Sequence, residues 1–227
     1  MIIDIKKQMI CGGDDCFENN RFNNSLNEEY IAHFSYKGLS IEQNPDVYYP
    51  FLRLLETVRP DRILEIGTFS GGFTLFIRDI LNNIGLEKTL INTYDINKSY
   101  LPNDIKNLNV YTENLFNDDY SDFVSDDIEG YIRDYIKQNG KTLILCDGGN
   151  KKNEFNLLCK FLKPDDIIMA HDYSYNYDFF NKNIAKKYWN WLEIEDKDID
   201  TSCEIYNLKP YMQDSFINVA WVCKIKK

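Results

Sequence analysis

The chain has 227 residues and a formal net charge of −10, with 36 acidic residues against 26 basic ones. This balance disfavours a nucleic acid as partner, because binding a polyanion requires clustered lysine and arginine side chains. Hydrophobic residues make up 44% of the chain, which excludes a largely disordered protein, and no apolar run reaches the length of a membrane span. We therefore expect a soluble, cytoplasmic protein with neither a nucleic-acid nor a membrane partner.

The order of apolar and polar segments predicts one α/β domain. Residues 1–43 are polar and irregular, and we expect them to form an N-terminal extension to a domain over 44–227. Strands are predicted at 63–66, 89–94, 108–112, 142–146, 167–170, near 190–195 and at 216–225, and helices at 44–58, 72–84, 121–138, 153–162 and 178–188. Between the last two strands we expect only a loop, 196–215. This alternation predicts a parallel sheet with helices on both faces and an antiparallel strand at one edge.

The segment from Glu65 to Gly72 is the most informative one in the chain. It follows a predicted strand, precedes a predicted helix, and has the spacing E-x-G-x-x-x-G-G. Glycines let the backbone approach a ligand at the carboxyl end of a strand. The spacing differs from the G-x-G-x-x-G fingerprint of dinucleotide sites, and an acid before the first glycine suits a ligand with a cationic amino group. This favours S-adenosylmethionine over NAD; the alternative is a tight turn that binds nothing.

Acidic or polar residues follow four further strands at the edge where ligands bind in open parallel sheets: Asp95, Glu113 with Asn114, Asp147, and His171 with Asp172. A single βα unit separates Asp147 from Asp172. If their strands are neighbours, about 4.8 Å apart, the two carboxylates repel each other unless a cation or a proton lies between them. A hard divalent ion, Mg²⁺ most simply, would satisfy both. The alternative is that each aspartate caps the turn that follows it.

The segment Leu64 to Gly72 resembles the first motif of the class I S-adenosylmethionine-dependent methyltransferases. Residues 38–45, Cys146-Asp147-Gly148 and 162–172 are similar to one subgroup, the cephalosporin hydroxylase-like and macrocin O-methyltransferase-like proteins. The resemblance implies a Rossmann-like methyltransferase fold, with a seven-stranded, mostly parallel sheet whose last strand is antiparallel and helices on both faces. It also implies site residues: for the cofactor Glu65, Gly67, Thr68, Ser70, Gly71, Gly72, Asp95 (ribose) and Asn114 (adenine), and for the metal Asp147, Asp172 and His171.

One position departs from the subgroup. Three residues after the first metal aspartate the subgroup usually has a histidine, and the catechol O-methyltransferases a lysine, whereas this chain has Asn150. Asparagine cannot act as a general base at neutral pH, so Lys151 or His171 is predicted to take that role.

These patterns together predict a metal-assisted O-methyltransferase that acts on a hydroxyl of a small molecule, a sugar or a glycosylated metabolite. Two alternatives stay open: an S-adenosylmethionine-binding enzyme of the same fold with different chemistry, and a binding protein without catalysis. The sequence also leaves open whether the chain forms a homo-oligomer.

Overall fold

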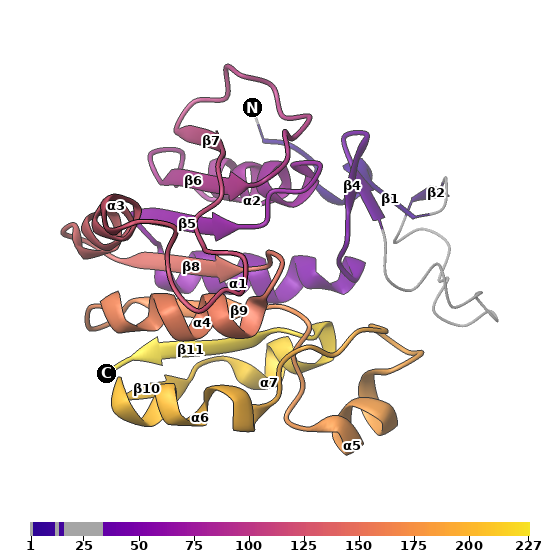
Figure 1. Cartoon of the computed structure of the whole chain (residues 1–227). Coiled ribbons are helices and arrows are strands. Elements are labelled where there is room, and N and C mark those ends of the chain that lie inside the picture. Colours follow the sequence, from indigo (N-terminus) through magenta and orange to yellow (C-terminus); the bar gives the residue numbers. More distant parts are fainter. Residues whose placement is uncertain (1, 12–13, 16–33) are drawn as a thin grey trace.

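The computed structural model describes residues 2–11, 14–15 and 34–227. A seven-stranded sheet runs through the molecule in the order β10-β11-β9-β8-β5-β6-β7 (Figure 1). Its strands are β5 (Arg62–Ile66), β6 (Leu90–Asp95), β7 (Leu108–Thr112), β8 (Thr142–Cys146), β9 (Ile167–Ala170), β10 (Leu208–Pro210) and β11 (Val222–Lys226). The pairs from β9 to β7 are parallel, and β11, the last strand of the chain, is antiparallel to both β9 and β10. The predicted fold class is confirmed.

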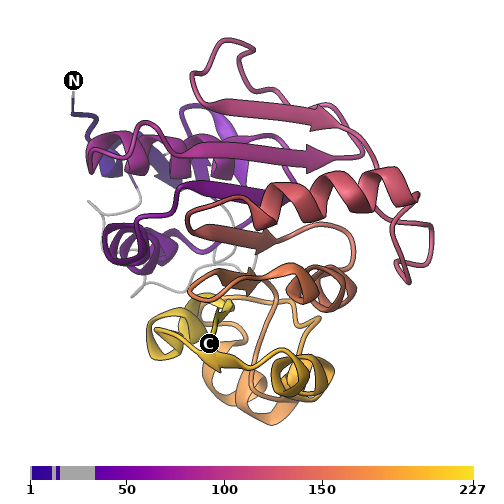
Figure 2. The ribbon, with the colours of Figure 1, turned by 90° about the vertical axis from the view of Figure 1, so that its left-hand side faces the viewer.

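Helices cover both faces of this sheet, and Figure 2 shows the resulting three layers. One face carries α1 (Tyr48–Val58), α2 (Gly72–Asn83) and α7 (Gln213–Phe216), and the other carries α3 (Asp126–Lys137), α4 (Lys151–Leu158) and α6 (Asp196–Ile205). The central strands β5, β8 and β9 are buried along their whole length, because helices exclude water from both sides of them. None of the described helices has the length and hydrophobicity needed to cross a bilayer.

The described part of the N-terminal extension is more regular than predicted. It forms a second, antiparallel sheet of β1 (Met9–Cys11), β2 (Asp14–Asp15), β3 (Phe34–Tyr36) and β4 (Leu39–Ile41). Phe34 and Tyr36 pack their rings against Phe76 of α2. In Figure 1 this small sheet lies on the side toward which β5 and β8 point. The extension therefore brings residues 39–43 to the carboxyl ends of the central strands.

Four predictions for the C-terminal part differ from the structure. The last strand, β11, begins at Val222 rather than at 216, because α7 and a 3-10 turn (Ile217–Val219) precede it. Residues 196–215 are not a loop, because they contain α6 and β10. Only Ile199 and Cys203 of α6 are buried, so its sequence has too few apolar residues at helical spacing to predict a helix. The helix begins with a capping box between Glu195 and Asp198. Residues 190–195 form no strand; a single bridge joins Ile194 to Tyr173. The predicted helix over 178–188 is α5 (Tyr177–Phe179) followed by one π-helical turn (Phe180–Ile184).

Candidate functional site

The candidate site lies at the carboxyl ends of β5, β6, β8 and β9. Strand β5 has β6 on one side and β8 on the other, so the chain changes direction across the sheet at this point, where open α/β sheets bind ligands. Two adjoining cavities occur here, a large one of about 610 Å³ and a small one of about 260 Å³. Both are lined by Ser40, Gly67, Phe69 and Asp147. A ligand in one cavity is therefore a neighbour of a ligand in the other.

The glycine turn after β5 is held against the turn after β8. Gly67 has φ +91, and a Cβ added there would lie 2.1 Å from the carbonyl oxygen of Asp147. Only glycine fits such a close approach at positive φ. Of the predicted cofactor residues in this turn, Gly67 and Ser70 line the large cavity and Thr68 the small one. Gly71 and Gly72 line neither of the two, and they let Leu101 and the backbone of β4 pack closely.

Glu65 is not brought to the surface of either of these cavities. Its side chain is buried beneath the glycine turn, where Thr74 Oγ1 donates to Glu65 Oε2 at 2.6 Å. Burial raises the pKa of Glu65 to about 7, against the opposing effect of hydroxyl groups from Thr74 and Thr93. The carboxyl is thus positioned to support the turn from below, and its predicted contact with a ligand stays a prediction.

Asp95 and Asn114 both line the large cavity, as a ligand-binding role requires. The two carboxylate oxygens of Asp95 accept backbone N–H groups from Phe69 and Asn97, at 2.7 and 2.8 Å. These bonds fix the carboxylate in place, and each oxygen keeps a lone pair for a further donor. The apolar part of the same cavity is lined by Ile66, Tyr94, Ile96, Leu115, Phe116 and Tyr120. This combination suits a ligand with a planar ring and vicinal hydroxyl groups.

A carboxyl group that the sequence analysis missed also lines the large cavity. Glu154 of α4 is fully buried and accepts backbone N–H groups from Gly148 and Asn150, both at 3.1 Å. Burial raises the pKa of Glu154 to about 7. The asparagine that replaces the subgroup's histidine has a structural role here, because the Asn150 side chain caps α4 by accepting the N–H of Asn153.

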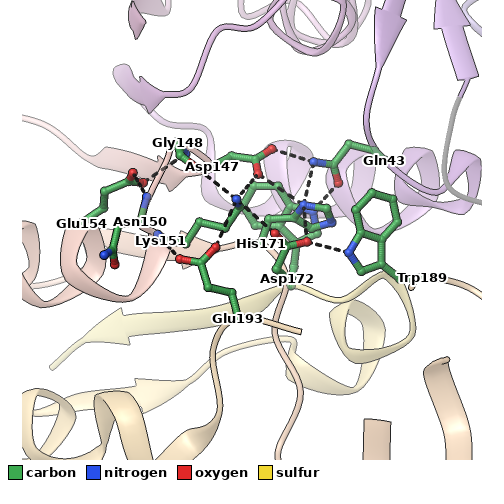
Figure 3. A network of polar contacts seen from close by, with 11 residues as sticks. Gln43, Asp147, Gly148, Asn150, Lys151, Glu154, His171, Asp172, Trp189 and Glu193 are labelled. Atoms are coloured by element: carbon green, nitrogen blue, oxygen red, sulfur yellow. Dashed lines mark hydrogen bonds and ion pairs between the residues drawn. The ribbon is translucent and has the colours of Figure 1, made fainter. Parts of the chain in front are cut away.

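Beside the small cavity lies a group that we call the lysine-bridged centre: Asp147, Lys151, His171 and Asp172 (Figure 3). The Lys151 ammonium lies 3.0 Å from Asp172 Oδ2 and 3.8 Å from Asp147 Oδ1. His171 Nδ1 lies 3.3 Å from Asp147 Oδ1 and 3.4 Å from Asp172 Oδ1. The structure thus brings together the three predicted metal ligands and both predicted bases.

Charges in the lysine-bridged centre stabilise one another. Burial acts to lower the pKa of Lys151, but the carboxylates of Asp147, Asp172 and Glu193 outweigh it and raise that pKa above its usual value. Burial acts to raise the pKa of Asp172, but His171 and Lys151 outweigh it and lower that pKa. In this arrangement Lys151 is a cation that neutralises two acids. A protonated lysine cannot accept a proton, so Lys151 is not placed to act as the base in this arrangement, and the predicted role of His171 as the base stays a prediction.

Three residues that the sequence analysis did not select hold the two aspartates in place. Gln43 Nε2 donates to Asp147 Oδ2 at 2.7 Å, and Trp189 Nε1 donates to Asp172 Oδ1 at 2.6 Å (Figure 3). Trp221 Nε1 in turn donates to Gln43 Oε1 at 2.8 Å, which fixes which end of the amide faces Asp147. Gln43 and Trp221 are both buried, and Gln43 belongs to the predicted extension rather than to the domain.

The donors of the lysine-bridged centre are compatible with a hard divalent ion. Within 2–11, 14–15 and 34–227 no group of three His, Cys, Asp or Glu residues is arranged as a metal-ligand set. Mg²⁺, however, usually retains several waters and binds through one or two carboxylates, and Asp147 and Asp172 supply two that converge on one point. The residues fit such an ion if the Lys151 ammonium moves.

No protein-family profile and no curated protein matches the chain. Solved structures do match it. An apo structure of CmcI has a TM-score of 0.59 at 14% identity and covers 85% of this chain and 76% of its own. An Mg–SAM form of CmcI has 0.56 at 14% identity, covering 84% and 76%, and an SAH form has 0.54 at 12%, covering 84% and 82%. With the strand order described above, this similarity shows that the chain has the class I methyltransferase fold.

Proposed function

We propose that the protein is an S-adenosylmethionine-dependent O-methyltransferase that acts on a hydroxyl group of a small molecule, a sugar or a glycosylated metabolite. The observation that carries this proposal is the junction of the two cavities at Gly67 and Asp147. A ligand cavity with a fixed ribose-type acceptor adjoins a charged centre suited to a hydroxyl group. CmcI, which is similar in fold, has been solved in Mg–SAM and SAH forms, and this also favours the proposal.

The cofactor would lie in the large cavity. Asp95 would accept the two ribose hydroxyls, a task for which its fixed and doubly accepting carboxylate is suited. Asn114 and the aromatic rings of Phe116 and Tyr120 would contact the adenine. The methionine end would then pass over Gly67, which places the sulfonium methyl group at the junction with the small cavity.

The acceptor would enter the small cavity, with its hydroxyl directed at the lysine-bridged centre. Asp147 and Asp172 would hold the divalent ion, which when bound lowers the pKa of an acceptor hydroxyl. Gln43 and Trp189 keep the two carboxylates oriented, and His171 is the group predicted to take the proton. The deprotonated hydroxyl oxygen would then bond to the methyl carbon as the carbon–sulfur bond breaks and S-adenosylhomocysteine leaves. Holding both reactants in adjoining cavities would supply the orientation that this displacement needs.

Isothermal titration calorimetry with S-adenosylmethionine and S-adenosylhomocysteine tests the cofactor part of this proposal. We expect the wild-type protein to bind both and Asp95→Ala to bind each about 100-fold more weakly, because two hydrogen bonds to a charged acceptor are lost. Asp104→Ala, which removes the same charge from an exposed position of the neighbouring loop, is the matched control and should bind normally. Equal affinities of Asp95→Ala and the control would refute the assignment of the large cavity.

A further inference from the structure

The point between Asp147 and Asp172 holds a positive charge that belongs to the protein itself. Lys151 Nζ lies within 4 Å of carboxylate oxygens from both residues, and its side chain is only 12% exposed. The aspartate side chains are 19% and 13% exposed, so water screens this triad weakly. A lysine ammonium therefore neutralises the repulsion for which the sequence alone suggested a divalent ion.

A divalent ion and this ammonium cannot lie between the two aspartates together. Both are cations, and two like charges a few ångströms apart in a poorly screened site repel strongly. Any ion that binds Asp147 and Asp172 must therefore displace the lysine head group. The cost of that displacement depends on whether the ammonium has somewhere else to go.

The structure provides such a place, because the Lys151 ammonium has further hydrogen-bond partners besides the two aspartates. Lys151 Nζ donates to the carbonyl oxygen of Gly148 at 3.0 Å and to Glu193 Oε2 at 3.4 Å (Figure 3). Glu193 is also tied to the start of α4, since its Oε1 accepts the backbone N–H of Lys151 at 2.7 Å. A small rotation of the lysine would thus exchange the two aspartates for Glu193 while keeping the ammonium paired.

We propose that the Lys151 ammonium and a divalent cation are alternative occupants of one cation position between Asp147 and Asp172, with Glu193 receiving the ammonium when the metal binds. The inference rests on the proposed metal role of the two aspartates but needs neither cofactor nor acceptor. Such an exchange keeps the centre electrostatically stable without metal. It also makes the affinity for the metal lower than it would be for the same two carboxylates without a competing ammonium.

Thermal unfolding of Lys151→Met, with and without Mn²⁺, tests the exchange. Without divalent ions we expect this variant to melt about 5 °C or more below the wild type, because two partly buried acids lose their counter-charge. Added Mn²⁺ should restore most of the loss. In calorimetry the variant should bind Mn²⁺ about tenfold or more tightly than the wild type, since no ammonium has to leave.

Lys152→Met is the matched control, because Lys152 is the next residue on the same helix and pairs with Asp198 at 2.8 Å, away from the centre. It should melt close to the wild type and show the wild-type response to Mn²⁺. The exchange is refuted if Lys151→Met is no less stable than Lys152→Met, or if its loss of stability is not restored by Mn²⁺. Neither result depends on cofactor binding, so a failure here is distinct from a failure of the proposed reaction.

A double variant keeps the inference testable if Lys151→Met does not fold. Adding Asp147→Asn removes one of the two uncompensated charges, so the double variant should fold without metal and should have lost the stabilisation by Mn²⁺. A double variant as unstable as Lys151→Met alone would show that the lysine contributes through packing rather than through its charge.

Discussion

The two cavities of the site differ in how far the protein satisfies its own polar groups. Around the large cavity, Asp95 accepts two backbone N–H groups, and its carboxylate oxygens can each accept a further donor. In the lysine-bridged centre both aspartates already have protein partners, namely Lys151, Gln43 and Trp189. The first cavity can accept a ligand by adding contacts, whereas the second must break some. Pre-organisation of a site and readiness for its ligand are thus separate properties.

Gly67→Ala should have the largest effect, because it removes the backbone contact that joins the two cavities. The new Cβ would lie 2.1 Å from the carbonyl oxygen of Asp147, at a φ of +91. We expect a loss of about 4 kcal/mol in the free energy of unfolding, measured by urea denaturation, from steric displacement added to backbone strain.

Gly85→Ala separates these two causes. Gly85 also has positive φ, +74, but a Cβ there would meet nothing within 4 Å. It should lose only about 1 kcal/mol, the cost of the left-handed conformation. Similar losses for both variants would mean that the close approach of the turns after β5 and β8 contributes nothing to stability.

The second prediction concerns the acid beneath the large cavity. Burial raises the pKa of Glu65 to about 7, above the value of 4.5 expected in the unfolded chain. The folded state therefore binds a proton more tightly, and its contribution to stability is complete below pH 4.5 and lost as the pH rises through 7. Between pH 5 and 8 the wild type should lose roughly 2 kcal/mol that Glu65→Gln retains.

Chemical denaturation across this pH range, performed on the wild type, Glu65→Gln and Glu154→Gln, measures the effect. Glu154 is the matched case, since burial raises its pKa to about 7 as well. Each single variant should remove part of the pH dependence, and the two parts should add. A pH dependence left unchanged by Glu65→Gln would mean that the carboxyl of Glu65 is ionised in the folded protein across this range.

The large cavity and the lysine-bridged centre also differ in how much of each could be predicted from the sequence. The large cavity is built from segments that end successive strands, so the glycine turn, Asp95 and Asn114 could be placed from local pattern alone. The lysine-bridged centre depends on contacts between residues that are far apart in the sequence. Gln43 forms hydrogen bonds with Asp147, 104 positions away, and with Trp221, 178 positions away. No periodicity or spacing within one segment records such pairings. Asp147 and Asp172 were found only because both follow apolar strands.

The missed elements have a related cause. Helix α6 buries only Ile199 and Cys203, so its amphipathic signal is weak, and its capping box uses glutamate and aspartate in place of the usual serine or threonine. The Asn150 side chain could have been assigned as a helix cap, because asparagine is a preferred residue at that position. The helix cap formed by Asn150 could therefore be predicted from local sequence preferences, whereas the formation of α6 depends on how it packs against α4.

The third prediction, with the smallest effect, separates the orientation of Asp147 from the general stability of the core. Gln43→Met keeps the volume of the side chain but removes the donor to Asp147 and the acceptor for Trp221. Residues that orient metal ligands typically change metal affinity by 10-fold or more when they are replaced. We therefore expect about tenfold weaker Mn²⁺ binding in calorimetry, with unchanged affinity for S-adenosylhomocysteine, whose proposed site is the large cavity.

The chain contains a matched control for this variant in a second buried glutamine on the same tryptophan. Gln213 Nε2 donates to the Trp221 carbonyl oxygen at 2.9 Å, and its Oε1 accepts the N–H of Cys223 at 2.8 Å, without contact to either aspartate. Gln213→Met should lose about as much stability as Gln43→Met, roughly 1–2 kcal/mol, because each leaves a buried polar group unpaired. Only Gln43→Met should weaken Mn²⁺ binding. Equal weakening in both would mean that the core around Trp221, and not the amide of Gln43, sets the geometry of the carboxylates.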